Sequence, residues 1–158
     1  MATETERKFL VTSDAWRDLV RGQPTAIAQG YLHVDAESEV RVRLQDDADA
    51  LLTVKRGGRS VARTEVEVPI GRAEARQLLD EAVVGVVLSK RRHLVDLPAV
   101  GDAPALVAEV DAFDGAHAGL VIAEVELPDA DTPLPDVDWL GDEVTGNPAY
   151  YNATLATG

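Results

Sequence analysis

Charged residues of one sign recur two positions apart along this sequence. Glu4 and Glu6 precede Lys8, and the same spacing separates Arg41 from Arg43. Side chains two positions apart on an extended strand point to the same face, so these pairs crowd like charges on one side of the chain. Such charges repel one another unless a counter-charge lies nearby. The spacing therefore indicates faces that could bind ions.

Seven basic and eight acidic side chains occupy faces of this kind. The basic residues are Lys8, Arg41, Arg43, Lys55, Arg63, Lys90 and Arg92, and the acidic residues are Glu4, Glu6, Glu65, Glu67, Glu109, Asp111, Glu124 and Glu126. Guanidinium and ammonium groups bind phosphate oxygens, whereas clustered carboxylates bind hard divalent cations. A closed or strongly curved sheet would turn the two sets into a basic side and an acidic side of one polar interior. That interior would suit a complex of metal and polyphosphate.

An ordinary antiparallel sheet is the alternative. Its charged faces would only meet water, while apolar residues such as Val40, Val42 and Leu44, which alternate with the arginines, would form the core. A solvated face usually mixes Thr, Ser and Gln with charges of both signs. Both interpretations need the same strands.

Alternating patterns predict eight strands joined mostly by short connections. They cover residues 3–11, 26–35, 38–45, 50–56, 61–69, 86–95, 106–113 and 120–127. Hairpin turns are predicted at Asp46-Asp47, Gly57-Gly58 and Asp114-Gly115. Helices are predicted after Ser13, over about residues 72–82, and from Asn147 to Leu155. We therefore expect a mainly β fold with a few flanking helices, in a single domain spanning residues 1–158.

The composition excludes several classes of function. Asp and Glu number 28 against 15 Lys and Arg, and the net charge of -13 disfavours nucleic acid or an anionic membrane as a partner. The absence of cysteine excludes thiol catalysis, disulfides and a Cys-ligated metal centre. No signal peptide and no bilayer-spanning apolar run is evident, so the expected location is the cytoplasm.

The charged motifs, taken in order, resemble those of the CYTH domain, or triphosphate tunnel metalloenzyme, family. The resemblance covers nearly the whole chain and rests on Glu4-Thr5-Glu6-Arg7-Lys8, Gln29-Gly30-Tyr31-Leu32, Val40-Arg41-Val42-Arg43, Leu52-Thr53-Val54-Lys55, Arg63-Thr64-Glu65-Val66-Glu67, Lys90-Arg91-Arg92, Glu109-Val110-Asp111 and Ala123-Glu124-Val125-Glu126. It implies an eight-stranded antiparallel closed barrel with a charged bore. The basic residues would hold a triphosphate, and the carboxylates would hold one or two Mg²⁺ or Mn²⁺ ions.

The same resemblance implies an activity. A small bacterial member of the family would hydrolyse inorganic triphosphate to pyrophosphate and phosphate, with water as the nucleophile. Adenylate cyclase, thiamine or nucleoside triphosphatase activity, and a non-catalytic polyphosphate-binding module, remain alternatives. The expected partner is a small-molecule triphosphate, and a homodimer is left open.

The resemblance also pairs Lys8 with Tyr31 as catalytic residues. A nearby ammonium would favour tyrosinate and lower the pKa of Tyr31, which would suit a general base. In the alternative, the Tyr31 hydroxyl only hydrogen-bonds a phosphate.

Overall fold

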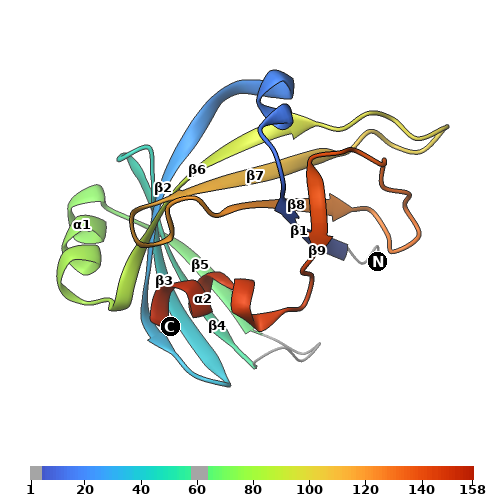
Figure 1. The fold of residues 1–158 in the computed structure, drawn as a ribbon. Helices are drawn as coiled ribbons and strands as arrows, with labels where there is room; N and C mark the ends of the chain where they lie inside the picture. The colour runs from blue at the N-terminus through green and yellow to red at the C-terminus, as the bar shows by residue number, and fades with distance from the viewer. Residues whose placement is uncertain (1–4, 58–63) are drawn as a thin grey trace. The chain divides into compact units, whose positions relative to one another are not determined.

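The computed structural model describes residues 5–57 and 64–158, which form a mainly antiparallel β structure (Figure 1). The strands are β1 (Thr5–Val11), β2 (Val20–Val34), β3 (Ser38–Gln45), β4 (Asp49–Arg56), β5 (Thr64–Ile70), β6 (Val84–Asp96), β7 (Val107–Asp114), β8 (Val121–Leu127) and β9 (Leu140–Glu143). The helices are α1 (Arg72–Glu81) and α2 (Asn152–Thr157), with 3-10 turns η1 (Ala15–Leu19), η2 (Gly115–His117) and η3 (Pro148–Tyr150). The strands pair in the order β5-β4-β3-β2-β6-β7-β8-β1-β9.

The chain divides into two compact units. The first contains residues 1–24, 91–113 and 119–147, and the second contains residues 25–90, 114–118 and 148–158. Strands β2 and β6 each continue from one unit into the other. The single domain expected from the sequence stays a prediction.

In the first unit, the strands separate an apolar face from a charged one. Register places Glu6 of β1 opposite Glu126 of β8, and Lys8 opposite Glu124. The residues between them along β8, including Val125, are buried in a core around Trp16. Burial of this apolar face offsets the repulsion among like charges on the other face.

In the second unit, α1 covers the apolar face of the sheet. Val42 and Leu44 of β3 pack with Ala75 and Leu79 of α1 in one buried cluster. Gly30 of β2 lies beneath α1, where an added Cβ atom would meet side chains of the helix and the segment that follows it. The alternate residues of β2 and β3 consequently point to the opposite, polar face.

The turn between β3 and β4 is confirmed and also anchors α1. Asp46 and Asp47 both have positive φ angles, 52° and 53°, and they are the central residues of a β-turn closed by the bond from Ala48 N–H to the Gln45 carbonyl. The Asp47 carboxylate accepts hydrogen bonds from Arg72, over 2.7 Å, and from Arg76. These bonds tie the first turns of α1 to the hairpin.

The mainly β fold with flanking helices is confirmed, but several boundaries differ from the predicted ones. Residues 140–143 form a ninth strand because they pair with β1, a long-range contact that four residues cannot signal by themselves. In the described residues, the pairing order ends at β5 and β9, whereas the prediction joined eight strands into a closed barrel. Strand β2 begins at Val20, six residues early, and the helix after Ser13 is only a 3-10 turn.

Three further expectations need correction. Asp114-Gly115 is not a tight hairpin, because η2 follows before β8 begins. The terminal helix is divided into η3 and α2. Val66 and Val68, the apolar residues that alternate with Glu65 and Glu67 on β5, were expected to face the core but are 52% and 42% exposed. The predicted strand starts at residues 3 and 61 lie outside the described residues.

Within the described part of the chain, no helix has both the length and the apolar character needed to cross a membrane.

The packing of Gly30 yields a prediction about stability. A Cβ atom there would lie 2.4 Å from Val83 Cγ1 and 3.0 Å from Leu79 Cδ2. We expect Gly30→Ala to lower the free energy of unfolding by about 1–3 kcal/mol, the usual cost of overpacking. Urea denaturation measures the change. The double variant Gly30→Ala, Val83→Ala provides space for the methyl group and should recover part of the loss. Unchanged stability of the single variant would contradict the packing.

Candidate functional site

The charged face of the first unit contains a carboxylate pair next to Lys8. Lys8 Nζ lies 3.5 Å from Glu124 Oε1, and both side chains are largely buried. Burial raises the pKa of Glu6 to about 7, helped by the negative charge of Glu124, a hydrogen bond with it and the charge of Glu126, while Lys8 acts in the opposite direction. Glu6 therefore binds its proton near neutral pH, at a position next to the Glu124 carboxylate.

Arg92 forms a second cluster on this face. Its Nε and Nη2 atoms donate to the two carboxylate oxygens of Asp111 over 2.8 and 3.0 Å, and Nη1 lies 3.1 Å from Glu109 Oε2. Asp111 is only 3% exposed. Burial lowers the pKa of Arg92, but the bond and charge of Asp111 outweigh it and raise the pKa above its usual value. This bidentate geometry fixes the plane of the guanidinium group.

The pKa of Glu109 depends on both clusters, the carboxylates next to Lys8 and the groups around Arg92. Burial raises its pKa, Arg92 opposes the rise, and the charges of Glu124, Asp111 and Glu126 add to it. Register places Glu109 of β7 opposite Glu124 of β8. The carboxylates of β1, β7 and β8 therefore act on one another across neighbouring strands.

The donor chemistry of this face fits a divalent cation. Carboxylate oxygens are the hard ligands that Mg²⁺, Mn²⁺ and Ca²⁺ prefer. Burial, and after it the negative charge of Glu124, raise the pKa of Glu6, and a cation would compensate that charge. In residues 5–57 and 64–158, no three acidic or histidine side chains already form a metal-binding group. Glu4, also predicted as a metal ligand, lies outside the described residues.

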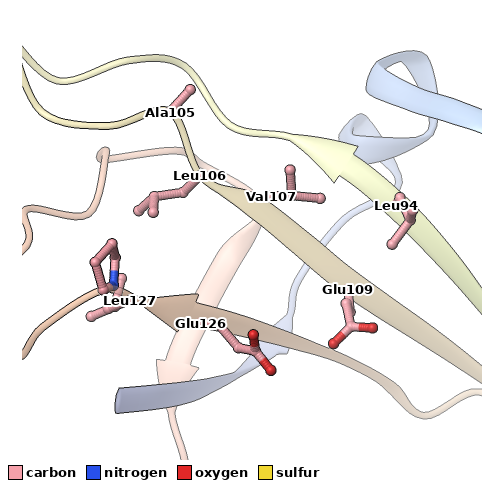
Figure 2. A pocket seen from close by; sticks show the side chains of 8 residues that line it. Leu94, Ala105, Leu106, Val107, Glu109, Glu126 and Leu127 are labelled. Carbon is pink, nitrogen blue, oxygen red and sulfur yellow. The ribbon is translucent and has the colours of Figure 1, made fainter. Parts of the chain in front are cut away.

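A pocket of about 590 Å³ adjoins the acidic face. Its apolar wall includes Leu94, Leu106 and Val107, and Glu109 and Glu126 contribute carboxylates. Figure 2 shows these two carboxylates projecting from neighbouring strands, with Leu94 and Val107 on the β6 and β7 side. The pocket therefore combines apolar surface with negative charge.

The polar face of the second unit contains a buried hydrogen-bonded chain. Arg43 Nε donates to Gln29 Oε1 over 2.7 Å, and Gln29 Nε2 donates to the Tyr31 hydroxyl over 2.9 Å. Gln29 and Tyr31 are almost completely buried. Burial raises the pKa of Tyr31, the charge of Glu39 adds to the rise, and Arg41 and Gln29 oppose it. The direction is opposite to the lowering expected for a general base.

Two lysines of the second unit have polar partners. Lys90 is 1% exposed, and its Nζ donates over 3.4 Å to Oδ1 of Asn152, the first residue of α2. Lys55 Nζ lies 3.9 Å from Glu39 Oε1. Register places Lys55 opposite Glu39, which shares a strand face with Arg41 and Arg43.

The remaining predicted carboxylates of the second unit lie on β5, which is mostly exposed. Register places Glu65 opposite Lys55 and Glu67 opposite Thr53, and Thr53 Oγ1 donates to Glu67 Oε1 over 3.4 Å. Arg63 lies outside the described residues. The structure thus brings Glu6, Lys8, Arg92, Glu109, Asp111, Glu124 and Glu126 together in the first unit and Tyr31, Arg41, Arg43, Lys55, Lys90, Glu65 and Glu67 in the second.

The sequence patterns did not indicate the polar partners of these residues, Gln29 and Asn152. Gln29 has the same strand parity as Tyr31, and this could have indicated that both share one face. The contact of Asn152 with Lys90 joins residues far apart in sequence and has no comparable signal. Asp111, predicted as a metal ligand, accepts two hydrogen bonds from Arg92 in this structure, and its role as a metal ligand stays a prediction.

Comparison with known proteins gives consistent matches over the whole chain. A family model described as the CYTH domain matches residues 2–155. An inorganic triphosphatase of Acetivibrio thermocellus is 38% identical over 155 residues, which cover 98% of this chain and 94% of the relative. One of Nitrosomonas europaea is 32% identical over 158 residues, with coverage of 98% and 97%.

Solved structures agree in fold. A crystal structure of the inorganic triphosphatase NE1496 has a TM-score of 0.75 and 30% identity, and the match covers 100% of this chain and 97% of that one. A structure of a putative adenylate cyclase from Bacillus halodurans has a TM-score of 0.56 at 17% identity, with 80% and 81% covered. The second likeness concerns the fold alone.

The pKa of Glu6 predicts how stability depends on pH without metal. Folding raises this pKa from 4.5 to about 7, so the folded state binds the proton more tightly and stability falls as pH rises between these values. We expect Glu6→Gln to remove on the order of 1 kcal/mol of the fall, because Glu6 is only half buried and solvent screens the interaction in part. Urea denaturation in chelator at pH 5 and pH 8 measures the difference.

A matched variant should show no such slope. The hydrogen bonds of Glu143 with Arg7 and Thr145 lower its pKa from 4.5, so its contribution to stability is present above that value and is lost only on further acidification. Glu143→Gln should therefore be less stable than wild type by a similar amount at pH 5 and at pH 8. Parallel curves for wild type and Glu6→Gln would contradict the assignment of a raised pKa to Glu6.

Proposed function

This chain belongs to the CYTH domain family, and we propose that it hydrolyses inorganic triphosphate to pyrophosphate and phosphate with the help of a divalent cation. The observation that carries the proposal is the crowding of Glu6 and Glu124 beside Lys8, on a face that also contains Arg92. Carboxylates that repel one another bind cations well, and cations next to them can hold phosphate oxygens. The names of the two curated relatives point to the same reaction.

Each charged group has a proposed role. The phosphate ligands would be Lys8, Arg41, Arg43, Lys55, Arg63, Lys90 and Arg92, and the metal ligands would be Glu4, Glu6, Glu65, Glu67, Glu109, Asp111, Glu124 and Glu126. Family membership implies dependence on a divalent cation, and we propose Mg²⁺ or Mn²⁺. When bound, such a cation would neutralise charge on the phosphate oxygens.

The protein's own groups would do most of the positioning. In the reaction, water attacks the terminal phosphorus, the bond from that phosphorus to the bridging oxygen breaks, pyrophosphate leaves, and the proton lost by the water passes to a product phosphate or to solvent. Arg92, oriented by Asp111, and Arg43, bonded to Gln29, would compensate the charge that develops on the phosphate oxygens. Lys8 would add a positive charge beside the carboxylate pair.

Lys8 and Tyr31 remain the proposed catalytic pair, with a neutral Tyr31. The raised pKa of Tyr31 keeps its hydroxyl protonated near neutral pH. A protonated phenol binds a phosphate oxygen by donating a hydrogen bond, and it does not remove a proton from water. This favours the second of the two roles that the sequence left open.

A second candidate activity is hydrolysis of an organic triphosphate, for which the pocket beside Glu109 and Glu126 provides apolar surface. Thiamine triphosphate carries a positive charge that these carboxylates could attract, and ATP carries an uncharged base. We also propose that the protein acts in the cytoplasm, as a monomer or as a homodimer.

Steady-state kinetics separate the two candidates. We expect a higher kcat/KM for inorganic triphosphate than for ATP or thiamine triphosphate, measured as phosphate release in the presence of Mg²⁺ or Mn²⁺. Leu94→Ala, which shortens the apolar wall of the pocket without adding charge beside Glu109 and Glu126, should leave the inorganic reaction nearly unchanged. A higher kcat/KM for either organic substrate would replace the first proposal by the second.

The role of Glu124 can be tested by removing its charge. Glu124→Gln should lower kcat on the order of 100-fold, a loss typical of groups that stabilise charge in the transition state. Calorimetric binding of metal-free triphosphate should remain, because Lys8 and Arg92 are retained. Asp102→Asn changes an exposed carboxylate in a loop of the same unit and serves as the control. Full activity of Glu124→Gln would remove this residue from the metal site.

A further inference from the structure

Gln29 is a buried amide whose two ends contact different functional side chains. Register places it directly opposite Arg43, and Tyr31 opposite Arg41, on neighbouring strands β2 and β3. Its oxygen accepts from Arg43 Nε over 2.7 Å, and its nitrogen donates to the Tyr31 hydroxyl over 2.9 Å. The Gln29 side chain has essentially no exposed surface.

The chemistry of these partners fixes the orientation of the amide. A guanidinium group only donates hydrogen bonds, so the amide oxygen of Gln29 must face Arg43. The amide nitrogen then necessarily faces the hydroxyl of Tyr31. Reversing the amide would place N–H groups against the N–H groups of Arg43 and leave a buried polar atom without a partner, which is costly.

Both polar ends of the Gln29 amide are already engaged, by Arg43 and by Tyr31, so an effect of Gln29 on the reaction acts through these two neighbours. The hydrogen bond to Nε restricts rotation of the Arg43 guanidinium group about its long, flexible side chain. An arginine that is already ordered loses less conformational entropy when it binds phosphate. The hydrogen bond to Tyr31 restricts the hydroxyl in the same way.

We propose that Gln29 is a positioning residue that orients Arg43 and Tyr31 for binding of the triphosphate. This inference rests on the proposed function, because that function supplies the triphosphate that Arg43 and Tyr31 would bind. The alternative is that Gln29 only satisfies buried polar groups and supports folding. The two roles differ in whether loss of Gln29 still weakens triphosphate binding after Arg43 has been removed.

A double-variant cycle provides the test. Gln29→Met retains the length of the side chain and removes both hydrogen bonds. We expect it to weaken binding of metal-free triphosphate, measured by calorimetry, by roughly tenfold, and to raise KM more than it lowers kcat. In the background of Arg43→Met, the same substitution should have a much smaller effect. Gln77→Met, on the exposed surface of α1, is the matched control.

A spectroscopic measurement reports on the other end of the amide. The hydrogen bond that Gln29 donates lowers the pKa of Tyr31, against burial and the charge of Glu39, while Arg41 also lowers it. Tyrosinate absorbance, with Tyr31→Phe used to assign the signal, should therefore show a higher pKa for Tyr31 in Gln29→Met. If that variant does not fold, Gln29→Glu is measured instead. It retains the acceptor for Arg43, loses the donor to Tyr31, and should raise the same pKa.

The results distinguish two failures. If the wild-type protein does not bind triphosphate, the proposed function is wrong. If it binds triphosphate but the losses from Gln29→Met and Arg43→Met multiply independently, or the pKa of Tyr31 does not move, Gln29 has no positioning role.

Discussion

Repulsion among the carboxylates that share one face of β1, β7 and β8 constrains the whole first unit. Antiparallel pairing places Glu6 opposite Glu126 and Glu109 opposite Glu124, where like charges destabilise a sheet. The opposite face compensates, because residues such as Val125 are completely buried around Trp16. Lys8 and Arg92 provide the internal counter-charges. The apolar core therefore allows the strands to hold a charge arrangement that a solvated sheet would relax.

In the second unit, the constraint is that polar side chains are buried and must have hydrogen-bond partners. Gln29, Tyr31 and Lys90 are almost inaccessible to solvent, and each has a hydrogen-bond partner. In an environment of low polarity, a bond to a buried charged group is strong and an unsatisfied group is costly. These networks therefore give the cations of the polar face defined positions before any ligand binds, whereas flexible surface lysines would have none.

Local patterns in the sequence predicted most of the fold, and long-range pairing accounts for the rest. The bounds of β3 and nearly those of α1 were predicted, because strict alternation and a helical apolar stripe are local signals. Strand β9 depends on pairing with β1, and its four residues have no pattern of their own. In the site, parity placed charged residues on common faces. It could not show that Asp111 binds Arg92, or that burial raises the pKa of Tyr31.

The carboxylates of the first unit fall into two groups with different capacities for metal. Asp111 already has a bidentate cationic partner in Arg92, so a metal ion would have to compete with a buried guanidinium group for its oxygens. Glu6 and Glu124 instead hydrogen-bond to each other, and the charge of Glu126 adds to their repulsion. A divalent cation gains most where negative charge is least compensated, and here one ammonium group, that of Lys8, faces the carboxylate pair. A cation would therefore be accommodated more easily beside Glu6 and Glu124, whereas Asp111 would become a ligand only by giving up bonds to Arg92.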